Sequence, residues 1–176
     1  MKSSGISASA VTITYTLNQT GAIWTIVQYS GVDTSGTDGS GAVVQSVTNR
    51  ADSADTTGLA ITLAALGSPN NMTVGGFANN SNSATSLTAG TGYTALTGAT
   101  IGLSPTMSLR SEYKAAGSTT VDMAQDATSH IAGIAVEIKQ VQVSIAGSVY
   151  DNTVAEGSTL LTGTPTVRIK VDGLGT

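Results

Sequence analysis

Apolar and polar residues alternate with a period of two along most of the chain. Residues 11–17 (VTITYTL) place Val, Ile, Tyr and Leu on one side and three threonines on the other. Such alternation predicts β-strands, because successive side chains of a strand point to opposite faces of a sheet. Residues 22–32 (AIWTIVQYSGV) are apolar on both sides, which predicts a central strand. Further strands are expected in residues 42–48, 58–66, 71–79, 107–115, 120–125, 131–139, 141–147 and 166–173.

Residues 107–115 (MSLRSEYKA) show the clearest alternation, with apolar residues on one face and charged residues on the other. The pattern is typical of an antiparallel strand with one solvated face. It places Glu112 beside Lys114 on that face, and Glu137 beside Lys139 in the same manner. We expect these carboxylates to form exposed cross-strand ion pairs.

The long run of residues 131–150 changes phase in its middle. Its apolar residues are even-numbered up to residue 138 and odd-numbered from residue 141. A bulge, a bend or a boundary between two strands is therefore expected near Lys139 and Gln140. Only residues 58–67 (GLAITLAALG) have a composition compatible with a helical turn.

About ten short strands separated by turns rich in Gly, Ser, Asn and Asp indicate an all-β fold. We expect an antiparallel β-sandwich, jelly-roll-like, over residues 1–139. Residues 140–176 are expected to add a C-terminal strand or hairpin that completes the same domain or reaches a neighbouring subunit. A β-solenoid is the alternative, but the spacing of the strands is irregular.

The composition narrows the setting of this fold. Charged residues form only 10% of the chain, while it holds 28 threonines and 21 serines, so hydroxyl groups dominate the expected surface. Such surfaces are common on virion and extracellular β-proteins, and we expect one of these locations. The net charge of −4 and the lack of a Lys/Arg cluster argue against a nucleic-acid partner. No uninterrupted apolar stretch is long enough for a transmembrane helix, so no membrane partner is expected.

The segment GVDTSGTDGSGAVV, residues 31–44, is a candidate for a metal site, and residues 48–58 (TNRADSADTTG), with Asp52 and Asp55, have the same character. Asp33 and Asp38 could bind calcium together with backbone carbonyl groups. An EF-hand counted from Asp33 would need a Glu where Val44 stands, and a phosphate-binding loop would need a Lys and a following helix. A surface loop is therefore the primary interpretation, calcium at Asp33 or Asp38 is the alternative, and no other cofactor is expected.

Candidate catalytic residues are sparse. His130 is the only histidine, and Ser129 beside it would point to the opposite face of a strand. No G-x-S-x-G nucleophile motif occurs. A glycosidase could draw a carboxylate pair from four residues, but ion pairing is the primary interpretation of Glu112 and Glu137, and no enzyme is expected. These four are Asp122, Asp126, Glu112 and Glu137.

The aromatic residues offer a weak ligand-binding hypothesis. Sugar-binding modules stack rings on exposed aromatic side chains, and this chain has only seven aromatic residues, most of them in phase with apolar strand positions. Tyr93 and Tyr150 lie beside glycine or turn residues and are the two candidates for an exposed ligand-binding ring.

Four stretches resemble the jelly-roll sandwich modules of phage virion, tail and decoration proteins and of metagenomic bacterial surface proteins. They are WTIVQYSGVD (24–33), TAGTGYTAL (88–96), SLRSEYKAAGSTTVDMAQ (108–125) and IAGIAVEIK (131–139). Those modules usually have more strands before the Trp block, and they usually stop where this chain continues for 37 residues. A C-terminal hairpin or a neighbouring copy would then supply the missing strands.

The resemblance and the composition together imply a non-enzymatic structural protein of a virion surface. It would be a capsid decoration or cement protein, or a tail or fibre component. Its partners would be its own copies, in a homo-oligomer such as a trimer, and a capsid or tail protein. The alternative is a carbohydrate-binding or adhesion module of a secreted bacterial protein, using the loop near Asp33 and the ring of Tyr93.

Overall fold

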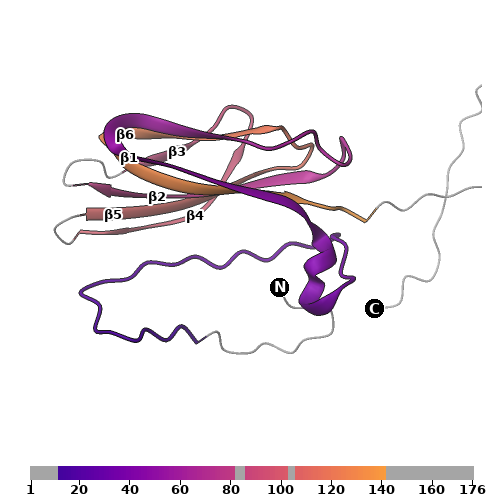
Figure 1. Cartoon of the computed structure of the whole chain (residues 1–176), viewed down its shortest axis with the longest axis horizontal. Coiled ribbons are helices and arrows are strands. Elements are labelled where there is room, and N and C mark those ends of the chain that lie inside the picture. Colours follow the sequence, from indigo (N-terminus) through magenta and orange to yellow (C-terminus); the bar gives the residue numbers. More distant parts are fainter. Residues whose placement is uncertain (1–11, 82–85, 103–105, 142–176) are drawn as a thin grey trace, which may run out of the picture. The chain divides into compact units, whose positions relative to one another are not determined.

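The computed structural model describes residues 12–81, 86–102 and 106–141. Nearly all of their regular structure is antiparallel β-sheet, which confirms the predicted all-β class (Figure 1). The elements are the 3₁₀-helix η1 (Thr37–Ala42) and the strands β1 (Val43–Thr62), β2 (Met72–Ser81), β3 (Leu87–Ala89), β4 (Thr94–Ile101), β5 (Thr106–Lys114) and β6 (Thr120–Ile138).

The six strands form a sheet in the order β1-β6-β2-β5-β4, with β3 also paired to β6. The C-terminal half of β6 lies between β1 and β2, where Ala135 is opposite both Val47 and Gly75. The N-terminal half of β6 pairs with the end of β1 and with β3, where Met123 is opposite both Leu59 and Ala89. Strand β6 therefore holds the described fold together.

The sheet folds over itself into two layers, consistent with the predicted sandwich. One layer contains the first part of β1, the second part of β6, and β2, β5 and β4, and the other contains the remaining halves of β1 and β6 with β3. Phe77 of β2 is fully buried between the layers, with Val121 from the opposite layer in the same core. The other buried members of this core are Leu59, Ile61, Leu63, Leu87, Met123, Ile131 and Ala135.

Polar side chains stabilise the bend between the two layers. The pairing of β1 with β6 shifts register between Ala51 and Gly58. At this point the buried amide of Gln125 donates to the carbonyl groups of Thr56 and Ser129, and its oxygen accepts from Asn79 at 3.0 Å. These bonds replace ladder hydrogen bonds that the bend removes, so the backbone remains satisfied inside the protein.

Several expected strand boundaries are different in the structure. The break expected around residues 126–130 is absent, because β6 runs continuously through the bend. Residues 42–48 and 58–66 contribute to one long strand, β1, and the helical turn considered for 58–67 is not formed. The break expected near Lys139 is confirmed, since β6 ends at Ile138.

The N-terminal strands expected in residues 11–17 and 22–32 are not part of the sheet. Residues 12–20 are exposed and have no strand structure, and Val11 is outside the described residues. Residues 21–33, called the arm from here on, form an extended segment whose side chains alternate between half-buried and exposed over residues 21–30. The prediction of a central strand was therefore wrong, because the arm packs across a face of the sheet and does not pair within it.

The described fold ends at Val141. The expected strand in residues 166–173 and the candidate Tyr150 lie outside the described residues. Residues 140–176 were predicted to form a C-terminal strand or hairpin that completes the same domain or reaches a neighbouring subunit, and this stays a prediction.

Two neighbouring glycines of β2 test the packing between the layers. A Cβ on Gly75 would lie 2.7 Å from the Phe77 ring and 2.8 Å from Val121, whereas one on Gly76 would meet only Ile134, at 3.6 Å. We expect Gly75→Ala to lower the free energy of unfolding by about 1–3 kcal/mol through overpacking. Gly76→Ala should be neutral or stabilising by up to about 1 kcal/mol. Urea denaturation of both variants checks this, and equal effects would contradict the inferred contact between layers.

Candidate functional site: the groove beneath the arm

A groove of about 820 Å³ lies between the arm and the outer face of the sheet. Its walls are mainly apolar or small side chains, and Arg50 is the only ionisable residue among the described residues that line it. The arm contributes Ile23, Trp24 and Thr25, and the sheet contributes Thr48, Asn49, Arg50, Gly76, Phe77, Ala78, Leu109, Ser111, Ala132, Gly133 and Ile134.

The odd-numbered residues of the arm face the sheet. Ile23, Thr25, Val27 and Tyr29 are half-buried, while the even-numbered residues between them are exposed. Thr25 and Ser111 share a hydrogen bond between their hydroxyl groups at 3.2 Å, which fixes the arm over β5. A two-residue period in an extended segment produces this division, because successive side chains point in opposite directions.

A second apolar cluster attaches the C-terminal end of the arm to the sheet. Gly31 has φ 70, a left-handed value that lets Tyr29 and Val32 both contact the sheet although they are three residues apart. Burial, followed by the nearby Tyr113, raises the pKa of Tyr29, whose hydroxyl is buried without a hydrogen-bond partner among the described residues. The cluster comprises Ala42, Met72 and Ile138, with Tyr29, Val32, Val74, Tyr113 and Val136 packed against them.

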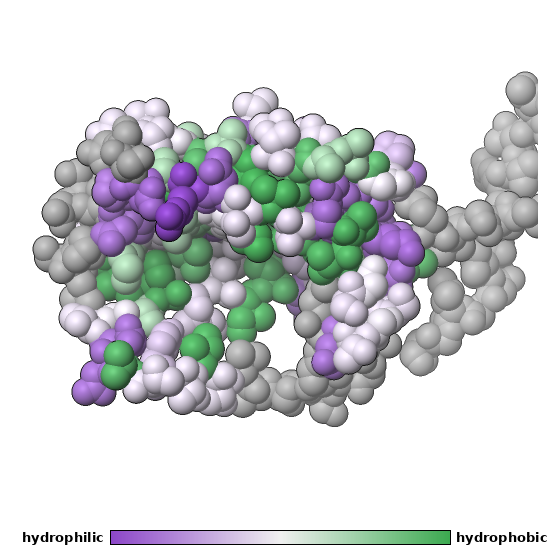
Figure 2. All heavy atoms as spheres, viewed as in Figure 1, coloured by the Kyte–Doolittle hydropathy of each residue, from purple (hydrophilic) through white to green (hydrophobic). Residues whose placement is uncertain are grey.

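The opposite side of the arm presents large apolar side chains to solvent. Trp24 and Ile26 are 54% and 55% exposed, and Ile13, Tyr15 and Leu17 before the arm are also exposed. Figure 2 shows green apolar residues between white and purple residues along the lower edge of the molecule. Such a concentration of exposed apolar residues marks a surface that can bind another chain.

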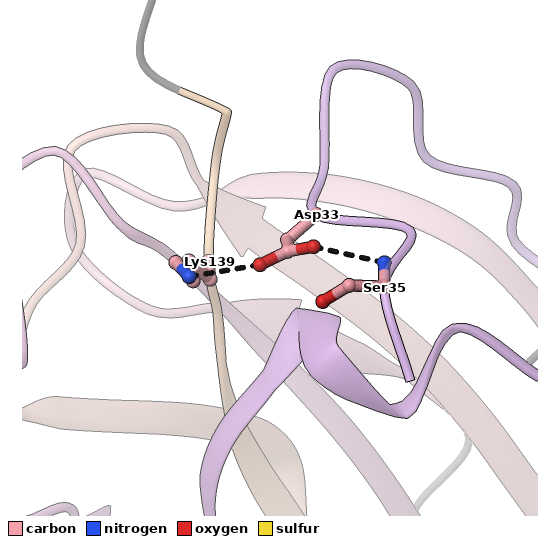
Figure 3. A network of polar contacts seen from close by, with 3 residues as sticks. All are labelled: Asp33, Ser35 and Lys139. Atoms are coloured by element: carbon pink, nitrogen blue, oxygen red, sulfur yellow. Dashed lines mark hydrogen bonds and ion pairs between the residues drawn. The ribbon is translucent and has the colours of Figure 1, made fainter. Parts of the chain in front are cut away.

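Asp33 ends the arm in an ion pair with Lys139. The Lys139 Nζ lies 2.8 Å from one carboxylate oxygen of Asp33, and the backbone N–H of Ser35 donates to the other at 2.9 Å (Figure 3). These hydrogen bonds, that of Lys139 foremost, lower the pKa of Asp33 well below its usual range. The carboxylate therefore joins the arm to the residue that follows β6.

The second metal candidate, Asp38, lies in η1 and is separate from this ion pair. Its side chain is exposed, and its backbone has φ 53. Within the described residues, no three His, Cys, Asp or Glu side chains gather closely enough to hold a metal ion. The calcium hypothesis for Asp33 and Asp38 thus gains no support from this geometry and stays an untested prediction.

Glu112 and Glu137 were expected on solvated faces, and this expectation was wrong. Both side chains are 0% exposed and lie inside the protein. The face of β5 predicted to be dry, which carries Leu109 and Tyr113, is instead the outer face that the arm covers. On the other face of β5, Glu112 is fully buried, while Arg110 and Lys114 are half-buried.

The two buried carboxylates are held differently. Glu137 accepts hydrogen bonds from Asn71 at 2.6 Å, from Gln45 at 2.7 Å and from the backbone of Gly67 at 2.8 Å. Burial raises the pKa of Glu137, but these hydrogen bonds outweigh it, so the net pKa is lowered.

Glu112 has far fewer hydrogen bonds. One of its oxygens accepts from the backbone N–H of Gly90 at 2.8 Å, and the other has no partner among the described residues. Burial, with a smaller contribution from Asp122, raises the pKa of Glu112 to about 7 against the opposing hydrogen bond from Gly90. Glu112 is therefore the less stable of the two buried carboxylates when ionised.

Tyr93, a candidate for ligand stacking, makes internal contacts. Its hydroxyl shares a hydrogen bond with that of Thr73 at 2.9 Å and donates to the backbone oxygen of Thr120 at 2.9 Å. The ring packs against the main core, and the Lys114 ammonium lies 5.6 Å from its centroid. These contacts give Tyr93 a structural role in joining β2, β5 and β6.

The candidate catalytic residues do not form a triad. His130 is exposed, whereas Ser129 is buried and its hydroxyl donates to the backbone oxygen of Asn80 at 2.9 Å. Asp126 accepts from the backbone N–H of Ser86 at 3.2 Å. The serine hydroxyl thus points to the interior, on the face opposite His130, as the alternation of a strand requires.

Comparison with protein-family models, with curated proteins and with solved structures finds no match for this chain. In the described part of the chain, no helix has the length and apolar character that a membrane crossing requires. The feature that sequence reasoning missed is the groove beneath the arm, and its signal was the row of apolar residues on both sides of residues 22–32.

Substituting each buried glutamate by glutamine tests the two opposite pKa shifts. Because the pKa of Glu112 is raised in the folded protein, its carboxyl group ionises at a lower pH in the unfolded chain than in the folded protein. Its contribution to stability therefore falls as the pH rises from about 4.5 to about 7. We expect Glu112→Gln to gain stability relative to the parent protein between pH 5 and pH 8, measured by thermal unfolding.

The matched variant Glu137→Gln should behave in the opposite manner. The ionised Glu137 accepts hydrogen bonds from Asn71, Gln45 and Gly67, so its loss should cost about 1–3 kcal/mol at neutral pH. This cost should shrink as the pH falls, since the lowered pKa contributes stability only while the carboxylate is ionised. Parallel pH profiles for the two variants would contradict the assignment.

Proposed function

We propose that the protein is a non-enzymatic structural protein of a virion surface, either a capsid decoration or cement protein or a tail or fibre component. It acts by packing against other protein chains. The single observation that carries this proposal is the arm, whose outward Trp24 and Ile26 are each more than half exposed. Buried aromatic side chains such as Trp are among the residues that contribute most binding energy where protein surfaces meet.

The chemistry of the groove supports packing over catalysis. Nucleophilic and acid–base mechanisms need ionisable groups that converge on one point. Among the groove residues only Arg50 is charged, and it forms an exposed ion pair with Asp52 at 3.0 Å. The groove therefore suits a surface that recognises shape and apolar area.

The sparse charge of the chain also supports association with a lattice of protein. With only 10% charged residues, neighbouring copies repel one another weakly when they are packed closely. We propose a homo-oligomer, with a trimer as the working hypothesis, together with a capsid or tail protein as the second partner. A jelly-roll arrangement of the strands and a location on the virion surface or outside the cell belong to the same proposal.

Light scattering after size exclusion tests the role of the arm. We expect the parent protein to form a stable oligomer and the double variant Trp24→Ser/Ile26→Ser to elute as a monomer with unchanged circular dichroism. The control is Val44→Ser, which removes an apolar side chain that is 44% exposed on β1, and it should remain oligomeric.

A monomeric parent protein would contradict this proposal. A glycan array tests the alternative function, carbohydrate binding, and adding EDTA shows whether any glycan binding depends on calcium. A monomer that binds glycans would favour a carbohydrate-binding or adhesion module of a secreted bacterial protein.

A further inference from the structure

The floor of the groove beneath the arm is an apolar hollow that stays open to solvent. Gly76, Ala78 and Ala132 carry at most a methyl group, so the outer face of the sheet is recessed at this point. Ala78 and Ala132 are exposed, and Ile134 is 42% exposed although its neighbours on both sides, Thr48 and Gly76, belong to paired strands. A large apolar side chain in the middle of a sheet is normally covered by a second layer. The arm therefore leaves part of this face without a cover.

The same chain exposes a set of large apolar side chains that the groove could cover. All of them are at least 43% exposed, so they do not fill the groove of their own chain, although Trp24 borders it. They lie in residues 12–32, which contain no charged residue. These residues, called the outward apolar residues from here on, are Ile13, Tyr15, Leu17, Trp24 and Ile26.

The groove and the outward apolar residues match in charge and in size. Arg50, the single ionisable residue among the described residues that line the groove, is already paired with Asp52 at 3.0 Å. Contact between the two surfaces therefore buries no unpaired charge, which would weaken association. A groove of about 820 Å³ lies within the range that holds a drug-sized molecule, so it can accept several apolar side chains.

We propose that the groove of one copy binds the outward apolar residues of a second copy. Each chain carries both surfaces, so any two copies supply one of each in equal amounts. About a quarter of the residues of an average protein are charged, and such a partner would bring charges into the groove. The segment of residues 12–32 brings none. The burial of Ile134 together with the outward apolar residues provides the driving force.

This inference rests on the proposed function and names the surface that self-association uses. The two contact surfaces are different parts of the molecule, so the copies associate head to tail. Such an interface generates a closed ring when the rotation between copies suits it, and the trimer of the proposed function is a ring of this kind.

Filling the groove tests the interface without changing the outward apolar residues. Ala132→Tyr places a large side chain at an exposed groove position, and tyrosine is well suited to a strand. The matched control Ala60→Tyr makes the same change at an exposed alanine of β1 that does not line the groove. By light scattering after size exclusion, we expect Ala132→Tyr to be a monomer and Ala60→Tyr to keep the oligomer of the parent protein.

A second blocking variant guards against misfolding of the first. Thr48→Tyr changes an exposed groove residue on β1 and should also be a monomer. It replaces Ala132→Tyr in every measurement if that variant loses the circular dichroism of the parent protein.

Mixing two monomeric variants tests the head-to-tail arrangement. The variant Tyr15→Ser/Leu17→Ser/Ile26→Ser keeps an intact groove, because none of these three residues lines it, and Ala132→Tyr keeps all outward apolar residues. We expect the equimolar mixture to form a dimer with one chain of each variant. No larger species should appear, because the dimer has neither a second open groove nor a second complete set of outward apolar residues.

Trp24 provides a spectroscopic measurement, since it is the only tryptophan of the chain. Its fluorescence emission should shift to shorter wavelength as the parent protein assembles with rising concentration, and it should not shift for Ala132→Tyr. An emission maximum that does not change on assembly of the parent protein would count against burial of Trp24 in the interface.

The outcomes separate this inference from the proposed function. If the blocking variants keep the oligomer of the parent protein, or if the two monomeric variants do not combine, the groove does not hold a second copy. The inference is then overturned, while the proposed function stands on association through another surface. A monomeric parent protein would instead contradict the proposed function, and this inference with it.

Discussion

The layer formed by β2, β5 and the second part of β6 has apolar residues on both faces, and this constraint determines the arrangement of the rest of the chain. Its inner face, with Phe77 and Ala135, is covered because β1 and β6 bend and return as a second layer. Its outer face carries Val74, Val136 and Tyr113, which water would otherwise reach. The arm exists as an ordered segment because that face must be covered.

The polar interior follows from the same double coverage. A sheet with solvent on one face would turn its charged residues outward, but here both faces are occupied and two glutamates are enclosed. Glu137 is stabilised by a set of hydrogen bonds that joins β1, β6 and the connection before β2. Glu112 accepts one hydrogen bond, from Gly90, and its other oxygen has no partner among the described residues, so its buried charge is the less well stabilised of the two. A buried carboxylate is therefore tolerated where several hydrogen-bond donors surround it, as at Glu137. It is costly where few donors reach it, as at Glu112.

Local alternation predicted β2, β5 and parts of β1 and β6, because the period of two depends on the backbone alone, but it predicted neither β3 nor β4. It predicted the end of β6 near Lys139 for the same reason. It failed for residues 22–32, since an extended segment that packs on a sheet and one that pairs within it have the same pattern. It also failed for the inner and outer faces of β5, because the amphipathic pattern identifies two faces without stating which one a distant segment covers. The contacts of Asp33 with Lys139 and of Glu137 with Asn71 join residues far apart in sequence, so no local pattern could reveal them.

The central position of β6 has a consequence for the biogenesis of the protein. This strand is the last of the described fold to be synthesised, yet β1, β2 and β3 all pair with it, and its end at Ile138 returns to Val43 at the start of β1. Until the ribosome has released that residue, the earlier strands have unpaired edges and an uncovered apolar face. Closure across so long a stretch of chain is slow, and the nascent protein is open to aggregation in the meantime. Folding of this domain is therefore completed only after β6 has left the ribosome, and molecular chaperones have their main opportunity to act before that point.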